Sequence, residues 1–134
     1  MNALLLIGAV ADGVAVAVHG GIGHRWMRQQ FAAVDFPASQ LFGDADVGRR
    51  VFGVTWHAVT AVFVVCATTL ALMAFGAVEK DVTALRLIAA IHAAAIVVAA
   101  LYFWRRLDAF IGKVPPVFAT CMSTVVVTTL IAAV

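Results

Sequence analysis

Ionisable side chains interrupt the long apolar runs of this sequence at only a few positions. Asp12 and His19 lie in the first run, His57 in the second and His92 in the third. An ionised carboxylate costs at least about 2.5 kcal/mol at the centre of a bilayer, so such a group needs a hydrogen-bonding partner and is a candidate for function. An imidazole beside a buried carboxyl can supply or remove its proton. These residue types therefore predict either proton handling or a hydrogen-bonded polar core.

Two other kinds of site are compatible with the same residues. Histidines on different helices at one depth, such as His19 and His57, can ligate a b-type haem axially. A histidine together with Cys121 can hold copper or zinc. A haem needs space between helices, and the glycines of segment 20–23 beside His19 offer such space. A proton site, a haem and a metal site are thus three alternatives.

The composition indicates that these residues belong to a membrane protein. Of 134 residues, 64% are hydrophobic and 12% are charged, whereas soluble domains have about 45–50% and about 25%. This excludes a water-soluble enzyme. The formal net charge is +2, and the basic residues lie at the ends of apolar runs, so there is no basic stripe that could follow a phosphate backbone. We expect the lipid bilayer as a partner and no nucleic acid.

Four apolar stretches are long enough to cross the roughly 30 Å hydrocarbon core, which takes about 20 residues in a helix. They cover residues 3–23, 51–76, 84–104 and 114–134. The runs are continuous and lack the alternation of a β-barrel, so their backbones must form helices to satisfy their own hydrogen bonds. We expect one transmembrane domain, an all-α four-helix bundle.

The basic residues predict the orientation of this bundle, because Lys and Arg near the ends of spans are retained on the cytoplasmic side. The connections at 24–50 and 105–113 hold seven of them, and the connection around 77–86 holds two. Both termini are therefore expected in the periplasm.

The 24–50 connection is the only long one and has structure of its own. Met27, Phe31 and Val34 recur at helical spacing before Pro37, which predicts a short helix lying on the membrane surface. The segment 43–46 (GDAD) predicts a turn that caps the second span.

Depth along the spans groups the polar residues into two layers. With a rise of 1.5 Å per residue, Asp12 and His92 both come out roughly 12–14 Å below the outer surface. His19, His57 and Cys121 come out near one another in a deeper layer.

The first span has two distinct faces. Asp12 and His19 are seven residues apart, share one face and are expected to point inward. The same face carries Leu5, Gly8, Ala15 and Gly23. The neighbouring face carries a small-xxx-small stripe that predicts tight helix packing, within the chain or with a second subunit. The stripe consists of Ala9, Gly13, Ala17 and Gly21.

Two motifs, residues 18–23 (VHGGIG) and 49–57 (RRVFGVTWH), carry a resemblance. The chain resembles small four-span proteins of the bacterial inner membrane with a His near the end of the first span and a Trp-His early in the second. This resemblance implies a bacterial inner membrane and no particular activity. The chain is also similar in outline to the small multidrug resistance transporters, which have one acidic residue in the first of four spans, where Asp12 lies. It lacks their third-span pattern over residues 85–104 and has a long 24–50 loop that is foreign to them.

These observations favour a non-enzymatic protein that acts as an accessory or structural subunit of a larger inner-membrane assembly. Helices with short outer connections leave no soluble domain for catalysis, and the apolar faces suit another membrane protein or a second copy of the chain. The alternative is a bundle in which the buried residues serve proton-coupled transport or hold a b-type haem for redox work. Those residues are Asp12, His19, His57 and His92.

Overall fold

In the computed structural model, the described residues are 1–33, 44–102 and 116–134, and side chains are described over 1–29, 44–101 and 117–134. Every regular element in these ranges is a helix, which confirms the all-α prediction. The elements are α1 (Ala3–Val16), the π-helical turn η1 (Ala17–Gly23), α2 (His24–Ala33), α3 (Ala45–Phe75), α4 (Val82–Tyr102) and α6 (Pro116–Ala132).

Three helices in the described ranges are long and apolar enough to cross a membrane. They are Ala3–Gln29, Ala45–Phe75 and Val82–Leu101. The predicted fourth span corresponds to α6, which has 17 residues and is shorter than the roughly 20 residues of a typical span. The flanking residues 105–113, which carried part of the orientation prediction, lie outside the described residues.

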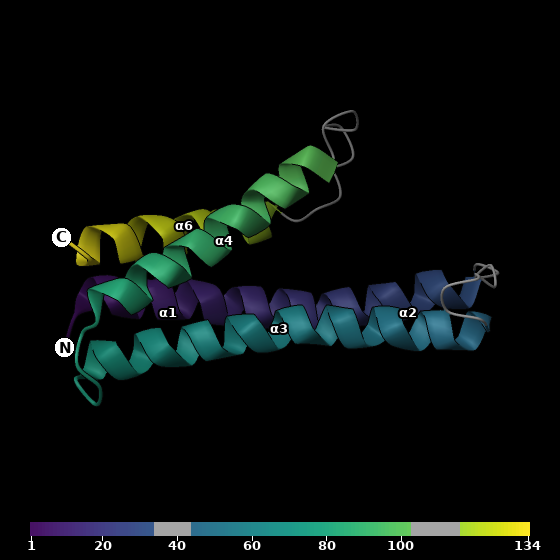
Figure 1. Cartoon of the computed structure of the whole chain (residues 1–134), viewed down its shortest axis with the longest axis horizontal. Helices are drawn as coiled ribbons and strands as arrows, with labels where there is room; N and C mark the ends of the chain where they lie inside the picture. Colours follow the sequence, from purple (N-terminus) through teal and green to yellow (C-terminus); the bar gives the residue numbers. More distant parts are fainter. Residues whose placement is uncertain (34–43, 103–115) are drawn as a thin grey trace.

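The first helix continues through the segment where a separate surface helix was predicted. The helix over 24–33 exists as α2, but His24 keeps a right-handed helical backbone (φ −61°, ψ −44°), so α1, η1 and α2 follow one another without a break. Figure 1 shows them as one rod beside α3. The expected change of direction is absent because nothing over 17–24 ends the helix and α3 packs along it. Met27 is buried, whereas the Phe31 side chain, Val34 and Pro37 lie outside the described residues.

Side-chain caps determine where the helices begin. Asp44 accepts a hydrogen bond from the backbone N–H of Asp46 at 2.9 Å and caps α3, which confirms the capping turn; Gly43 lies outside the described residues. The second span thus begins at Ala45 and not at residue 51, because this cap starts the helix before its apolar run. Gly76 ends α3 with φ +74°, a left-handed conformation that glycine adopts without strain.

The extensive contacts between the helices form a row. Helix α1 packs against α3 and α6, and α4 packs against α6. Figure 1 shows α4 running obliquely across the others. An apolar groove of about 400 Å³ lies between α3 and α4, with Cys66 and Ile88 among its lining residues.

Both chain termini lie at the same end of the bundle as the α3–α4 connection (Figure 1). The backbone N–H of Asn2 donates to the Ala74 carbonyl at 2.8 Å. Lys80 Nζ donates to the Ala132 carbonyl at 2.9 Å. These contacts join the start of α1, the end of α3 and the end of α6, while α2 lies at the opposite end.

The face of the first span that was predicted to point inward is buried at Leu5, Asp12 and Ala15. Gly8, on this face, allows α6 to approach closely, because an added Cβ would lie 2.7 Å from Thr128 Oγ1. The small-xxx-small stripe that begins at Ala9 is only partly packed against other helices. Ala9 itself is buried, but an added Cβ at Gly13 or Gly21 meets nothing within 4 Å.

We therefore expect Gly8→Ala and Gly13→Ala to differ. The methyl group at position 8 displaces Thr128 and is expected to lower the free energy of unfolding by about 1–3 kcal/mol, as overpacking does. At position 13 the methyl group enters open space, and the greater helix propensity of alanine leaves stability unchanged or raises it by up to about 1 kcal/mol. Thermal unfolding in detergent, followed by circular dichroism, measures both; equal stability of the two variants would contradict this packing.

Candidate functional site

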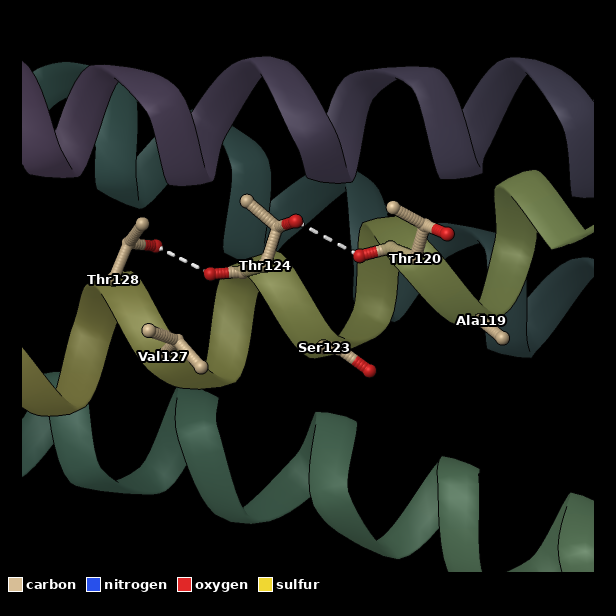
Figure 2. Close-up of a pocket in the computed structure, with 6 residues that line it drawn as sticks. All are labelled: Ala119, Thr120, Ser123, Thr124, Val127 and Thr128. Carbon is tan, nitrogen blue, oxygen red and sulfur yellow. Dashed lines mark hydrogen bonds between the residues drawn. The ribbon is translucent and has the colours of Figure 1, made fainter.

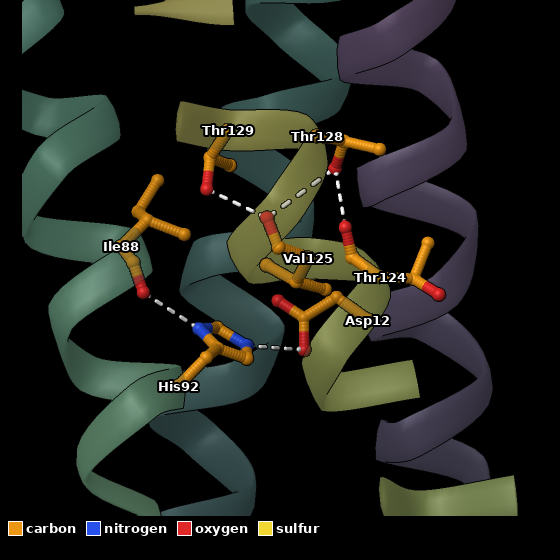
Figure 3. A network of polar contacts seen from close by, with 7 residues as sticks. All are labelled: Asp12, Ile88, His92, Thr124, Val125, Thr128 and Thr129. Atoms are coloured by element: carbon orange, nitrogen blue, oxygen red, sulfur yellow. Dashed lines mark hydrogen bonds and ion pairs between the residues drawn. The ribbon is translucent and has the colours of Figure 1, made fainter. Parts of the chain in front are cut away.

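A fully buried polar contact joins the first and third predicted spans. His92 Nε2 on α4 lies 3.1 Å from Asp12 Oδ1 on α1. Both side chains have 0% exposure. Figure 3 shows the imidazole reaching from α4 toward the carboxyl group. The structure thus brings together the two residues that the depth estimate placed in one layer.

A second hydrogen bond fixes where the protons of this pair reside. His92 Nδ1 lies 2.8 Å from the carbonyl oxygen of Ile88, and because a carbonyl can only accept, Nδ1 carries a hydrogen. If Asp12 is ionised, Nε2 also carries a hydrogen and the imidazole is positively charged. If Asp12 is protonated, its O–H donates to a neutral Nε2. In both arrangements the pair holds one shared proton and has no net charge.

One oxygen of the carboxyl group remains unused. Asp12 Oδ2 is buried and has no hydrogen-bond partner within the described part of the chain. An orphaned buried oxygen costs free energy and is unusual in native structures. It is the atom of this pair at which a further proton would bind.

The hydroxyl groups of α6 do not serve this oxygen. Thr124 donates to the Thr120 carbonyl and Thr128 to the Thr124 carbonyl, each at 2.8 Å, and Thr129 donates to the Val125 carbonyl at 2.6 Å. Such bonds to the preceding turn are common in membrane helices. Figure 2 shows the polar side chains along α6 that line a shallow hollow of about 490 Å³.

His19 lies in a second polar cluster between η1 and α3. Its ring stacks on Trp56, with centroids 4.1 Å apart and planes 9° apart, and its Nδ1 lies 2.9 Å from Thr60 Oγ1. Thr60 donates its only hydroxyl hydrogen to the Trp56 carbonyl, so His19 Nδ1 is the donor to Thr60. The Trp56 indole N–H in turn donates to the His19 carbonyl at 3.2 Å.

His57 contacts a histidine that the sequence analysis did not single out. The rings of His57 and His24 have centroids 4.8 Å apart, and His24 Nδ1 is buried without a partner among the described residues. His57 directly follows Trp56, the residue on which His19 stacks. The cluster therefore contains three histidines, from η1, α2 and α3.

His24 was assigned to the 24–50 connection after the first span, and regular helical spacing would also have placed it away from this cluster. In a regular α-helix each residue advances by about 100°, so residue 24 would lie about 120° away from the face of Asp12. The wide turn η1 (Ala17–Gly23) accommodates about one extra residue. This brings His24 back toward α3. The signal in the sequence was the glycine-rich segment 20–23.

These glycines accommodate side chains of α3. An added Cβ at Gly20 would lie 2.8 Å from Thr60 Cγ2, and one at Gly23 would lie 2.8 Å from Trp56 Cζ2. The space that the sequence offered for a haem between His19 and His57 is therefore filled by Trp56 and Thr60. The described residues do not fit that haem site.

A metal site with Cys121 gains no support either. Cys121 belongs to the apolar cluster of Ala15, Phe63 and Met122, and Cys66 and Cys121 are both free and buried. Over the described ranges there is no group of three or more His, Cys, Asp or Glu side chains arranged to hold a metal ion.

Comparisons of the chain with protein-family models, with curated proteins and with solved structures find no match. The chemistry of the two polar clusters is therefore the available guide to function.

The proton assignment predicts how substitutions at Asp12 differ. In Asp12→Asn, the side-chain amide can donate to neutral His92 Nε2, so the free energy of unfolding should stay within about 1 kcal/mol of the unsubstituted chain. Asp12→Ala leaves Nε2 buried without a donor and should cost about 1–3 kcal/mol more. Thermal unfolding in detergent compares the two, and an equal loss in both variants would show that no hydrogen bond at Nε2 stabilises the fold.

Proposed function

We propose that this protein is a proton-handling membrane bundle in which the Asp12–His92 pair takes up and releases a proton during proton-coupled transport. The observation that carries the proposal is the geometry of that pair: a buried carboxyl and imidazole at 3.1 Å, with one carboxyl oxygen that has no hydrogen-bond partner among the described residues.

The charge of the pair supports coupling between proton binding and another event. One shared proton makes the pair neutral, whereas one more gives a buried charge of +1 and one fewer gives −1. A buried charge that no opposite charge compensates costs several kcal/mol. A proton therefore enters or leaves favourably only if a second charge moves or if the helices rearrange to admit water.

The arrangement of the helices offers such a rearrangement. Helix α4 packs on α6, and it contacts α3 through His92 and Phe63 beside an apolar groove between the two helices. The hydrogen bond from His92 to Asp12 is the polar link from α4 to α1 among the described side chains. Protonation of this pair would weaken the link and allow α4 to shift relative to α1.

The orientation and location are part of the proposal. The end with α2 carries Arg25, Arg28, Arg49 and Arg50, and the end with both termini carries Lys80 and Arg86. Together with the resemblance to small bacterial inner-membrane proteins, this bias favours a bacterial inner membrane with both termini in the periplasm.

The orientation can be tested by cysteine labelling in intact bacterial cells. In a background with Cys66→Ala and Cys121→Ala, a membrane-impermeant maleimide is expected to label Glu79→Cys at the α3–α4 connection and to leave Arg49→Cys near the start of α3 unlabelled until the cells are opened. Labelling with the opposite pattern would reverse the proposed orientation.

The proton function can be tested by infrared spectroscopy of the protein in nanodiscs. We expect the C=O stretch of a protonated carboxylic acid that changes in amplitude with pH and disappears in Asp12→Asn, which should fold for the reason given above. Asp46→Asn is the matched control, because Asp46 is exposed and pairs with Arg50 at a helix end. A titration that is the same in Asp12→Asn and in the unsubstituted chain would overturn the proton function.

A second candidate is an accessory subunit of a larger membrane assembly. It is favoured by the groove between α3 and α4, whose lining is almost entirely apolar and includes Val62, Val65 and Leu87. An accessory subunit needs the Asp12–His92 pair only for stability. The same infrared experiment separates the two, since a pair that does not titrate in the folded protein supports the accessory role.

A further inference from the structure

Phe63 separates the two polar clusters. Its ring is 2% exposed. Its centroid lies 5.3 Å from that of His92 and 6.1 Å from that of His19. Phe118 lies beside it, at 6.1 Å from Phe63 and 6.2 Å from His19. A phenyl ring cannot carry a proton, so it interrupts a row of titratable side chains that otherwise extends from the middle of the bundle toward α2.

The histidine cluster on the α2 side of Phe63 has the chemistry of a proton relay. A neutral imidazole can accept a proton at its free ring nitrogen and release it again. His19 already donates through Nδ1 to Thr60, so its Nε2 is the accepting nitrogen. His57 is exposed at the surface of the bundle, and the adjoining His24 has a buried Nδ1 with no hydrogen-bond partner in the part of the chain that the structure describes. The cluster thus runs from an exposed ring to the half-buried ring of His19.

The charged side chains around this cluster lie at its outer end and are exposed. In the described residues they are Arg25 and Arg28 on α2, together with Asp44, Asp46, Arg49 and Arg50 at the start of α3. The contact between His19 and Phe63 is aromatic, so within the described ranges a proton that reaches His19 has no charged side chain there to transfer to.

We propose that His57, His24 and His19 form a relay that delivers protons from the α2 end to the Asp12–His92 pair, and that Phe63 is the gate between the relay and the pair. This inference rests on the proposed proton function. A proton that arrives from the α2 end protonates His57 or His24. The N–H bond of that imidazolium then breaks as an N–H bond forms at His19 Nε2, and the donor ring becomes neutral again. When Phe63 turns aside and water enters, that N–H bond breaks and an O–H bond forms at Asp12 Oδ2.

The relay and the gate make opposite predictions for the rate of protonation. After a rapid drop in pH, the Asp12 carboxyl band of nanodisc-embedded protein is followed over time by infrared spectroscopy. His19→Ala is expected to slow its appearance on the order of 100-fold, as loss of a positioned proton-transfer group does. Phe63→Leu, which keeps an apolar side chain, is expected to speed it about tenfold, since removing the gate lowers the barrier. Phe75→Leu, an exposed phenylalanine at the other end of α3, is the control and should have no effect.

Thr60 provides a test that does not remove a histidine. Thr60→Ser retains the hydroxyl acceptor for His19 Nδ1 and should protonate Asp12 at the original rate, whereas Thr60→Val should be slow. Circular dichroism confirms that each variant is folded, and variants that are not folded are replaced by His19→Gln and Phe63→Met.

The outcomes distinguish the relay from the proton function. If the Asp12 band titrates but its rate is unchanged in the His19 and Phe63 variants, protons reach the pair by another route and the relay is overturned alone. If the band does not titrate in the unsubstituted chain, the proton function and the relay fall together. A slow His19 variant and a fast Phe63 variant support both.

Discussion

The hydrogen bond from His92 Nδ1 to the carbonyl of Ile88 is the constraint on which the polar core depends. This bond holds Nδ1 within α4, so Nε2 needs either a hydrogen-bond donor or a carboxylate within reach. Asp12 meets that need in both protonation states. A contact of this kind is stable only when it is dry, because water would compete for both groups. The apolar side chains of α1, α3, α4 and α6 around the pair exclude that competition.

Close helix contacts in this bundle use glycines opposite particular side chains of another helix. Gly8 faces Thr128, Gly20 faces Thr60 and Gly23 faces Trp56. At each of these contacts, a glycine lies against a residue whose side chain makes a hydrogen bond. The packing therefore positions polar groups as well as filling space. In contrast, Gly13 and Gly21 face open space, which in a membrane is where lipid or another protein lies.

Hydropathy and helical rise predicted the helices, the inward face of the first span and the common depth of Asp12 and His92. These features depend on distances along one helix, which the sequence contains. Contacts between helices depend on side-chain shapes that meet only after folding, so the stacking of His19 on Trp56 had no signature in the spacing. For the same reason the glycines of segment 20–23 were interpreted as room for a haem, whereas Trp56 and Thr60 fill that room. His24 was missed because the first span was predicted to end at residue 23, whereas the helix continues through η1 into α2, and a period of 3.6 residues per turn does not hold across a π-helical turn.

The π-helical turn η1 also determines how α2 is rotated about the helix axis, and so which way its side chains point. Removing one residue from Ala17–Gly23 would restore a continuous α-helix and turn α2 by about 100° about its axis. His24 and the buried Met27 would then face away from α3, while Asp12 and the rest of α1 would stay in place. A single-residue deletion would thus alter one polar cluster and preserve the other. During evolution, insertions or deletions in this segment can therefore change one polar cluster without changing the residues of the bundle core.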